Sequence, residues 1–193
     1  MAASSIEKTP IALVRNYNDV LGLSLQGNVF GVTNPTVDTG VTGQTSYAAT
    51  LATLSLRNLG SKIMVPLYCL MSQTGTVAGG RISVHSQTLD TDQFTSGTEI
   101  TVRNRNGYKG AAPTVRAYHT ATLPTFTTGN ATAVATLDVF QTVSAVSTSD
   151  PVDVWPFPGF VAVKPNGALH VYTDATITGP TWFFNIAWAE IEV

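Results

Sequence analysis

Residues 160–173 read FVAVKPNGALHVYT, and in this stretch two apolar, β-branched runs flank the four residues KPNG. Pro165 restricts the backbone at the entry of a turn, and the pair Asn166 and Gly167 accepts the positive φ angles that a tight turn needs. Every second residue of the two flanking runs is apolar: Val161, Val163, Leu169 and Val171. We therefore predict a β-hairpin at this point of the chain.

Further strand candidates lie on both sides of this hairpin, separated by Gly and Pro. The clearest are residues 52–58, 80–87 and 99–104, and weaker or mixed ones are residues 114–123 and 133–146. Residues 62–72 are continuously apolar, which is typical of a strand buried on both faces, and Pro66 there indicates an edge strand or a bulge. Residues 181–193 form a predicted central core strand, with four large side chains on one face: Trp182, Phe184, Ile186 and Trp188.

Eight to ten short strands with turn signals between them indicate an all-β fold. We expect one antiparallel β-sandwich domain over residues 26–193, with the jelly-roll-like arrangement of eight strands in two sheets. Residues 10–23 have loosely helical spacing, so residues 1–25 form either an N-terminal arm or a short helix. Residues 31–46 are rich in Gly, Thr and Asn and are the best candidate for a mobile or surface-laying loop.

The composition argues against several classes of partner. The 193 residues include 10 basic and 12 acidic side chains, and the net charge of −2 gives no electrostatic footprint for nucleic acid or an anionic membrane. Charged residues make up only 11% of the chain, against about 25% in ordinary soluble domains, whereas 29 residues are Thr. Such a surface suits a protein that neighbouring subunits largely cover, because isolated proteins rely on charge to stay apart.

No catalytic set stands out in the sequence. We find neither a nucleophile elbow nor a glycine-rich phosphate loop, and the single cysteine, Cys69, lies in an apolar run where we expect it to be buried. His85, His119 and His170 lack the spacing of metal ligands, so we expect surface or interface histidines, no enzyme activity and no cofactor. The N-terminus has no signal-peptide pattern, and the apolar run at residues 63–71 is too short to cross a bilayer.

Three segments are candidates for contacts with other molecules. Residues 103–110, RNRNGYKG, form a candidate polar contact loop with Arg103, Arg105, Tyr108 and Lys109. Residues 152–160 interleave aromatic residues with Pro and Gly, so we expect an irregular segment that either caps the core or anchors a neighbouring subunit. The expected interface comprises these aromatics and the N-terminal arm: Ile6, Ile11, Val14, Arg15, Trp155, Phe157 and Phe160.

The order of several motifs resembles a group of structural proteins from tailed-bacteriophage virions. These motifs are NVFGVT (28–33), TLSLRNLGSK (53–62), ATLPTF (121–126), VAVKPNGALHVYT (161–173) and FFNIAWAEIEV (183–193). In that group an L-x-N-P-x-G-S-x-K type turn joins two early strands, and a V-x-A-P-G-x-A-L type hairpin precedes a closing F-x-W-E-E type strand. This chain departs from the pattern in lacking the proline after Asn58 and in separating Glu190 from Glu192.

The resemblance implies a virion structural protein that is made in the host cytoplasm. Our first hypothesis is a capsid decoration (cement) protein on the capsid surface, a homo-oligomer with a trimer favoured, which stabilises the head by binding the major capsid protein. The alternative is a tail or head-fibre component that binds a glycan receptor. A second alternative is a metal-dependent β-sandwich enzyme built on the three histidines, because a sandwich can bring distant strands together.

Overall fold

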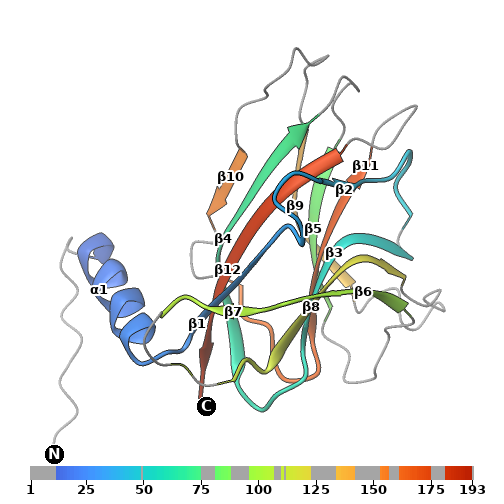
Figure 1. Ribbon diagram of the computed structural model, residues 1–193. Coiled ribbons are helices and arrows are strands. Elements are labelled where there is room, and N and C mark those ends of the chain that lie inside the picture. The colour runs from blue at the N-terminus through green and yellow to red at the C-terminus, as the bar shows by residue number, and fades with distance from the viewer. Residues whose placement is uncertain are drawn as a thin grey trace, which may run out of the picture.

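The protein folds into two antiparallel β-sheets packed face to face, with one helix beside them (Figure 1). The computed structural model describes residues 12–48, 50–74, 81–87, 96–106, 110, 112–122, 134–141, 153–156, 161–174 and 181–192. Side chains of residues 12–18, 74, 81, 121–122, 134–141, 153–156 and 174 lie outside this description. The prediction of an all-β, antiparallel sandwich is confirmed.

Each sheet has six strands. Sheet A contains, in spatial order, β10 (Asp153–Pro156), β4 (Ile63–Thr74), β12 (Thr181–Ile191), β1 (Val29–Thr33) and β7 (Arg103–Asn104), with β2 (Val41–Thr42) also paired to β12. Sheet B contains β6 (Ser96–Ile100), β8 (Val115–Thr122), β3 (Leu51–Asn58), β11 (Ala168–Asp174), β5 (Arg81–Gln87) and β9 (Val134–Gln141). Neighbouring strands in the sequence therefore often lie in different sheets.

The core lies between the sheets and is filled by alternate residues of the central strands. Leu54 and Leu56 of β3 are fully buried, as their alternation predicts. Strand β12 contributes its four predicted core residues, each at most 4% exposed: Trp182, Phe184, Ile186 and Trp188. Burial of each such side chain contributes about 1.5–3 kcal/mol. The predicted central position of the C-terminal strand is confirmed, since β12 pairs with both β4 and β1.

The predicted hairpin at residues 160–173 is wrong, although the predicted turn is present. Asn166 has a φ of 61°, and the N–H of Gly167 donates to the carbonyl of Lys164 at 3.0 Å. Val163, however, forms a bridge with Met64 in sheet A, whereas β11 pairs with β3 and β5 in sheet B. The turn thus connects the two sheets instead of joining two paired strands.

Of two other strand predictions, the one for Pro66 is confirmed as a bulge and the one for residues 99–104 is wrong. Strand β4 lies between β10 and β12, so Pro66 is not on an edge strand, but the predicted bulge is present where Ala187 pairs with Tyr68 and Trp188 with Pro66. The segment 99–104 is not one strand: it enters sheet B as β6 and sheet A as β7. In Figure 1, β6 and β7 follow one another across the front of the sandwich. This segment therefore ties the two sheets together along one side.

The N-terminal segment forms a helix, α1 (Ala12–Leu25), rather than an extended arm. Gly27 ends it with a φ of 78°, which favours glycine. The N–H of Gly27 donates to Ser24 and that of Asn28 to Leu23, both at 2.9 Å, which is the Schellman motif of helix ends. Figure 1 shows α1 beside the sandwich, on the side of β1. No helix in the described part of the chain is long and apolar enough to span a membrane.

Candidate functional site

Two of the three histidines come together on the outer face of sheet B. His85 of β5 and His170 of β11 are direct cross-strand partners, and their neighbours Val84 and Val171 face the core. Both histidines are buried, at 6% and 1% exposure, so the surface reading of these two is wrong. His119 lies on β8, which β3 separates from β11, and is not brought to the other two. The described residues contain no group of three or more His, Cys, Asp or Glu that could hold a metal ion.

Aromatic rings enclose His85. Tyr47 stacks on the His85 ring with centroids 5.8 Å apart, and Tyr172 meets the same ring edge-on at 4.9 Å. Tyr47 and Tyr172 also contact each other at 5.2 Å. The Nε2 atom of His170 forms a hydrogen bond of 2.9 Å with Oε1 of Gln87. No sequence pattern distinguishes Tyr47 or Gln87, because Tyr47 precedes the strand and Gln87 is one of many polar residues.

Burial keeps this cluster uncharged at neutral pH. The pKa of His170 is lowered to about 3, chiefly by desolvation and also by electrostatic repulsion from His85 and Arg57. Burial also lowers the pKa of His85 and raises that of Tyr172. A general acid or base works best with a pKa near the working pH. These side chains therefore suit a neutral, packed network better than proton transfer.

An open pocket of about 450 Å³ lies at one end of the sandwich. One wall is the loop of residues 35–44, and the other is made by residues 51–53 of β3 together with His119 and Thr120 of β8. Thr120 has a φ of 50°, a left-handed conformation that a β-branched residue adopts only under strain. Burial lowers the pKa of His119, so its imidazole is neutral at pH 7. We call this region the pocket end.

The loop that forms the first wall is held in place. Asn34 donates from Nδ2 to the carbonyl of Trp182 at 3.0 Å and to that of Thr39 at 3.3 Å, and its Oδ1 accepts from the N–H of Phe184. The N–H of Gln44 donates to the carbonyl of Thr173 at 2.9 Å. Residues 34–46 are therefore anchored to strands of both sheets. The prediction of a loop over residues 31–46 is wrong for residues 31–33, which belong to β1, and for Val41 of β2, which is buried in the core.

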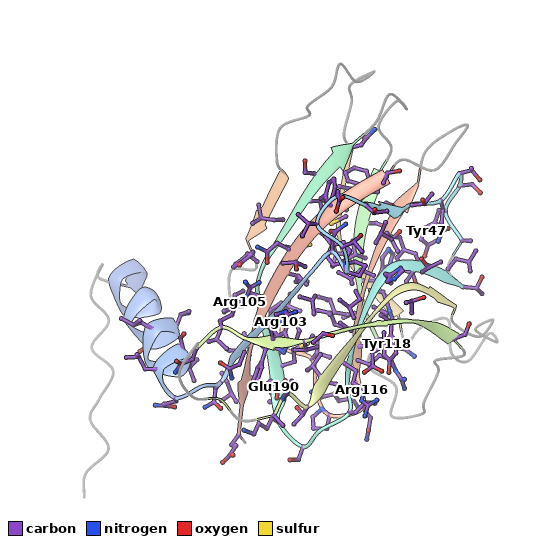
Figure 2. The ribbon with its side chains drawn as sticks, in the orientation of Figure 1. Tyr47, Arg103, Arg105, Arg116, Tyr118 and Glu190 are labelled. Atoms are coloured by element: carbon purple, nitrogen blue, oxygen red, sulfur yellow. The ribbon has the colours of Figure 1, made fainter. Side chains whose placement is uncertain are left out.

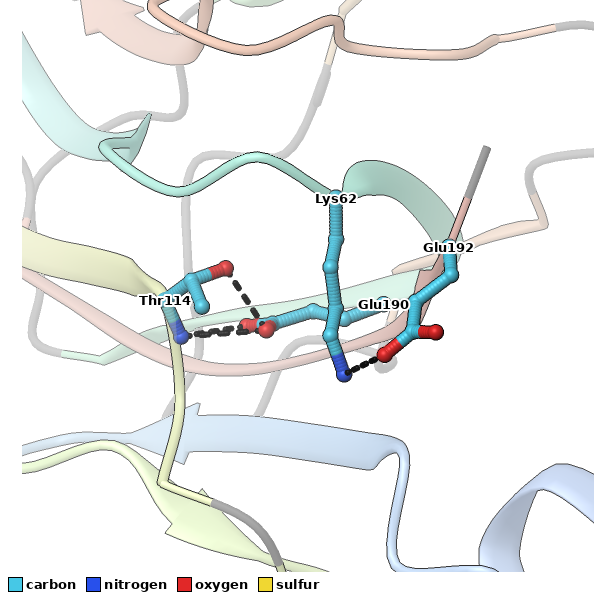
Figure 3. Close-up of polar contacts among 4 residues, drawn as sticks. All are labelled: Lys62, Thr114, Glu190 and Glu192. Carbon is cyan, nitrogen blue, oxygen red and sulfur yellow. Dashed lines mark hydrogen bonds and ion pairs between the residues drawn. The ribbon is translucent and has the colours of Figure 1, made fainter.

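A dense polar network occupies the opposite end of the sandwich (Figure 3). The Glu190 carboxylate, 1% exposed, accepts the N–H groups of Thr114 and Val115, the Thr114 hydroxyl at 2.7 Å and the Nε1–H of Trp188 at 3.3 Å. Lys62 and Glu192 form an ion pair of 3.4 Å nearby. Glu190 thus ties the start of β8 to the end of β12.

Asn58 joins the two turns at this same end. Its Nδ2 donates to the carbonyls of Lys62 at 2.7 Å and Val163 at 3.0 Å, and its backbone exchanges hydrogen bonds with Asn166 and Gly167. The motifs 53–62, 161–173 and 183–193 meet here, and we call the region the junction end. Side-chain hydrogen bonds of Asn58 and Glu190 thus hold the strand ends and turns of these motifs together.

In the predicted contact loop, Asn104 and Arg105 form hydrogen bonds with other parts of the same chain. Arg105 donates from Nη2 to Oδ1 of Asn185 at 2.6 Å and lies over Gly31, where a Cβ atom would stand 2.3 Å from its guanidinium. Asn104 donates to the carbonyl of Gly27 at 2.6 Å, and Asn106 to that of Leu25 at 3.1 Å. Figure 2 shows both arginines on the side of the sandwich toward α1. Arg103 is exposed.

Helix α1 exposes two leucines in its C-terminal half. Leu21 is 45% and Leu25 is 71% exposed. Residues four apart lie on the same face of a helix, so the two leucines form one apolar strip. The strip lies next to the segment 103–106, because Asn106 holds the last turn of the helix.

Several predicted contact residues cannot be placed. Ile6, Ile11, Tyr108, Lys109, Phe157 and Phe160 lie outside the described residues. Val14 and Arg15 belong to α1 and Trp155 to β10, where the backbone is described. Trp155 pairs with Cys69 in regular antiparallel register, so the expectation of an irregular segment is wrong for residues 153–156. Cys69 is buried as predicted, and burial raises the pKa of its thiol to about 12.

The comparisons with known proteins give no relative. No model of a protein family, no curated protein and no solved structure matches this chain.

Proposed function

We propose that this chain is a structural protein of a tailed-bacteriophage virion, and specifically a capsid decoration protein with a jelly-roll fold. The observation that carries the proposal is the nested pairing of eight strands. The first strand pairs with the last, the second with the next to last, and so inward: β1 with β12, β3 with β11, β4 with β10, and β5 with β9.

This nesting supports the jelly-roll assignment. A jelly roll is one long antiparallel hairpin of eight strands wrapped so that successive pairs alternate between two sheets, and viral capsid domains are among its users. The four pairs here alternate in that way, with β1·β12 and β4·β10 in sheet A and β3·β11 and β5·β9 in sheet B. Strands β6, β7 and β8 are then an insertion between β5 and β9.

The phage resemblance supports the virion role, because the motifs that carry it make structural contacts. Asn58 and Glu190 hold strand ends and turns together at the junction end. A decoration protein needs no reactive group: it stabilises the shell by binding only its assembled form. The low charge of 11% also suits a surface that other subunits cover.

Helix α1 supports a specific mode of attachment. A helix of 14 residues is marginal by itself in water, and its leucine strip lacks cover in the monomer. We therefore propose that Leu21 and Leu25 dock into an apolar groove of the major capsid protein, with Arg103 at the rim. Two further groups would extend this contact: the arm residues Ile6, Ile11, Val14 and Arg15, and the aromatic residues Trp155, Phe157 and Phe160. We propose that the protein binds as a homo-oligomer, with a trimer favoured.

The deciding experiment locates the protein in purified virions by antibody labelling. Even labelling of the head at a fixed ratio to the major capsid protein supports decoration. Labelling confined to the tail or to fibres favours the attachment alternative instead, and its absence from virions overturns the virion proposal.

A binding assay tests the helix. The double variant Leu21→Asp/Leu25→Asp should lose co-sedimentation with undecorated capsids by more than about tenfold, since two apolar contacts are replaced by charges. The matched control is Leu59→Asp, which changes a leucine of 46% exposure at the junction end and should bind normally. Full occupancy by the helix variant would show that α1 is not the docking element.

A further inference from the structure

The pocket end has the construction of a preformed ligand site. Its loop wall is fixed by the Asn34 and Gln44 hydrogen bonds to strands of both sheets. Its other wall consists of regular strand residues of β3 and β8. The volume of about 450 Å³ is within the range of pockets that take small molecules. A rigid cavity of this kind loses little entropy on binding.

The lining is uncharged and mixed in polarity. Among the residues that the structure describes, this lining holds no Asp, Glu, Lys or Arg. Hydroxyl, amide and imidazole groups come from Thr36, Thr39, Thr42, Gln44, His119 and Thr120. Apolar surface comes from Pro35, Val41 and Leu51. Both kinds of surface thus border the same small volume.

Some of the polar groups are available to a ligand. The side-chain Oε1 of Gln44 accepts the N–H of Ala48 at 3.2 Å, so its Nε2 is left to donate. The Nδ1 atom of His119 bonds to the Thr120 hydroxyl at 3.1 Å, which leaves Nε2 on the other side of the ring. Among the described residues, the pocket therefore offers at least two side-chain nitrogens for hydrogen bonds.

The uncharged hydroxyl, amide, imidazole and aliphatic groups of the described lining point to a class of ligand. Phosphate and carboxylate ligands are bound by Arg or Lys, and cations by carboxylates, so neither fits. A neutral sugar ring has hydroxyl groups around its edge and apolar C–H faces, which matches this mixture of donors, acceptors and aliphatic surface. We propose that the pocket binds a neutral hexose residue of a polysaccharide. The pocket opens to solvent, so the rest of a glycan chain can extend outward.

Thr120 gives the site a second distinguishing feature. A left-handed backbone at a β-branched residue costs free energy and persists where the surroundings demand it, often at ligand sites. Its φ of 50° turns β8 beside His119. The strained residue and the half-buried imidazole therefore belong to the same wall of the same pocket.

Nuclear magnetic resonance titration of the full-length, ¹⁵N-labelled protein tests this inference. The probes are the methyl glycosides of glucose, galactose, mannose, rhamnose and N-acetylglucosamine, whose capped anomeric oxygen imitates a residue within a chain. We expect at least one to shift amide signals of residues 35–44, 51–53 and 119–120, with a dissociation constant on the order of millimolar.

Substitutions of a pocket residue test whether the glycoside binds in the pocket. His119→Ala should weaken the bound glycoside by about tenfold, since one hydrogen bond to a neutral group is worth about a factor of ten. His119→Gln, which keeps a donor nitrogen, should recover part of the loss. The matched control is Thr101→Ala in a second depression lined by Glu99 and Arg116, and it should leave affinity unchanged.

The outcomes that overturn the proposal are definite. No amide shift with any of the five glycosides at about 50 mM, or shifts confined to residues outside the pocket, would show that no hexose residue binds there. Binding of a free sugar but not of its methyl glycoside would exclude a polysaccharide residue. The inference does not depend on the virion proposal, because binding is measured on the isolated protein and location on the particle.

Discussion

The two ends of the sandwich use the same kinds of residue for different purposes. At the junction end, a buried carboxylate and a buried asparagine satisfy the backbone groups of several strand ends and turns. At the pocket end, a half-buried asparagine fixes one loop, and an open volume with free donors remains beside it. Saturated hydrogen bonding indicates a region that maintains the fold, whereas unsaturated groups in a fixed cavity indicate a region that binds something.

Removal of the Glu190 carboxylate should have the largest effect. Glu190→Ala leaves the N–H groups of Thr114 and Val115, the Thr114 hydroxyl and the Trp188 indole without their acceptor. We expect the free energy of unfolding to fall by about 4 kcal/mol, because each unsatisfied buried donor costs about 1–3 kcal/mol. Urea denaturation followed by tryptophan fluorescence measures this loss.

The variant Glu190→Gln distinguishes the contribution of the side-chain volume to stability from that of the negative charge. It keeps one acceptor oxygen and the side-chain volume, so we expect a loss of about 2 kcal/mol. A loss below 1 kcal/mol in Glu190→Ala would mean that water replaces the carboxylate easily. The junction end would then be no more essential to the fold than the pocket end.

Acid should destabilise the protein through His170, which lies between the two ends on the outer face of sheet B. Its pKa is about 3 in the folded state and 6.5 in the unfolded reference. Between these values only the unfolded chain binds the proton, so stability is complete above pH 6.5 and falls as the pH drops toward 3. The slope is about 1.4 kcal/mol per pH unit, or about 3 kcal/mol at pH 4.5 relative to pH 7.

The control for this prediction is His170→Gln, which retains an amide that can bond Gln87 and removes the titration. Its unfolding free energy should depend less on pH by about 1.4 kcal/mol per unit between pH 6 and 4. His85 is also expected to contribute to the remaining slope, because burial lowers its pKa as well. Parallel pH profiles for the parent protein and the variant would rule out His170 as the source.

A matched pair of asparagine variants compares the ends directly. Asn58 is fully buried and bonds across the two turns, whereas Asn34 is half-buried and holds a surface loop. Asn58→Ala should cost about 3 kcal/mol and Asn34→Ala about 1 kcal/mol, since water can reach the groups that Asn34 releases. Thermal unfolding checks the order of the two effects. Equal losses would remove the distinction between the ends.

Sequence patterns predicted the faces of the strands better than their partners. Alternation in β3 and β12 identified Leu54, Leu56 and the aromatic core residues, because one buried face imposes a period of two. The KPNG turn was identified too, yet the strand before it joins Met64 in the other sheet. Local turn chemistry specifies a reversal of the chain, but the pairing of strands depends on long-range packing that no short segment contains.

The candidate sites illustrate the same limit. His119 was singled out as a possible metal ligand, but its neighbours in the pocket come from residues 35–44, which are far away in sequence. Likewise, Glu190 was noted as part of a closing motif, while its partner Thr114 carried no signal. Hydrogen bonds between distant loops follow from the way the chain crosses between the two sheets and are not encoded in local spacing.

Relief of strain at Thr120 should have the smallest effect and the opposite sign. Gly adopts the left-handed backbone without the penalty of about 1–2 kcal/mol that an L side chain meets, but it costs about 0.5–1 kcal/mol in chain entropy. Thr120→Gly should therefore raise the unfolding free energy by about 0.5 kcal/mol. Thr98→Gly, on the neighbouring strand β6 with an ordinary backbone, should lower it by a similar amount. If both variants lose stability, the conformation of Thr120 carries no strain, and the pocket end would lose one of the two features that distinguish it.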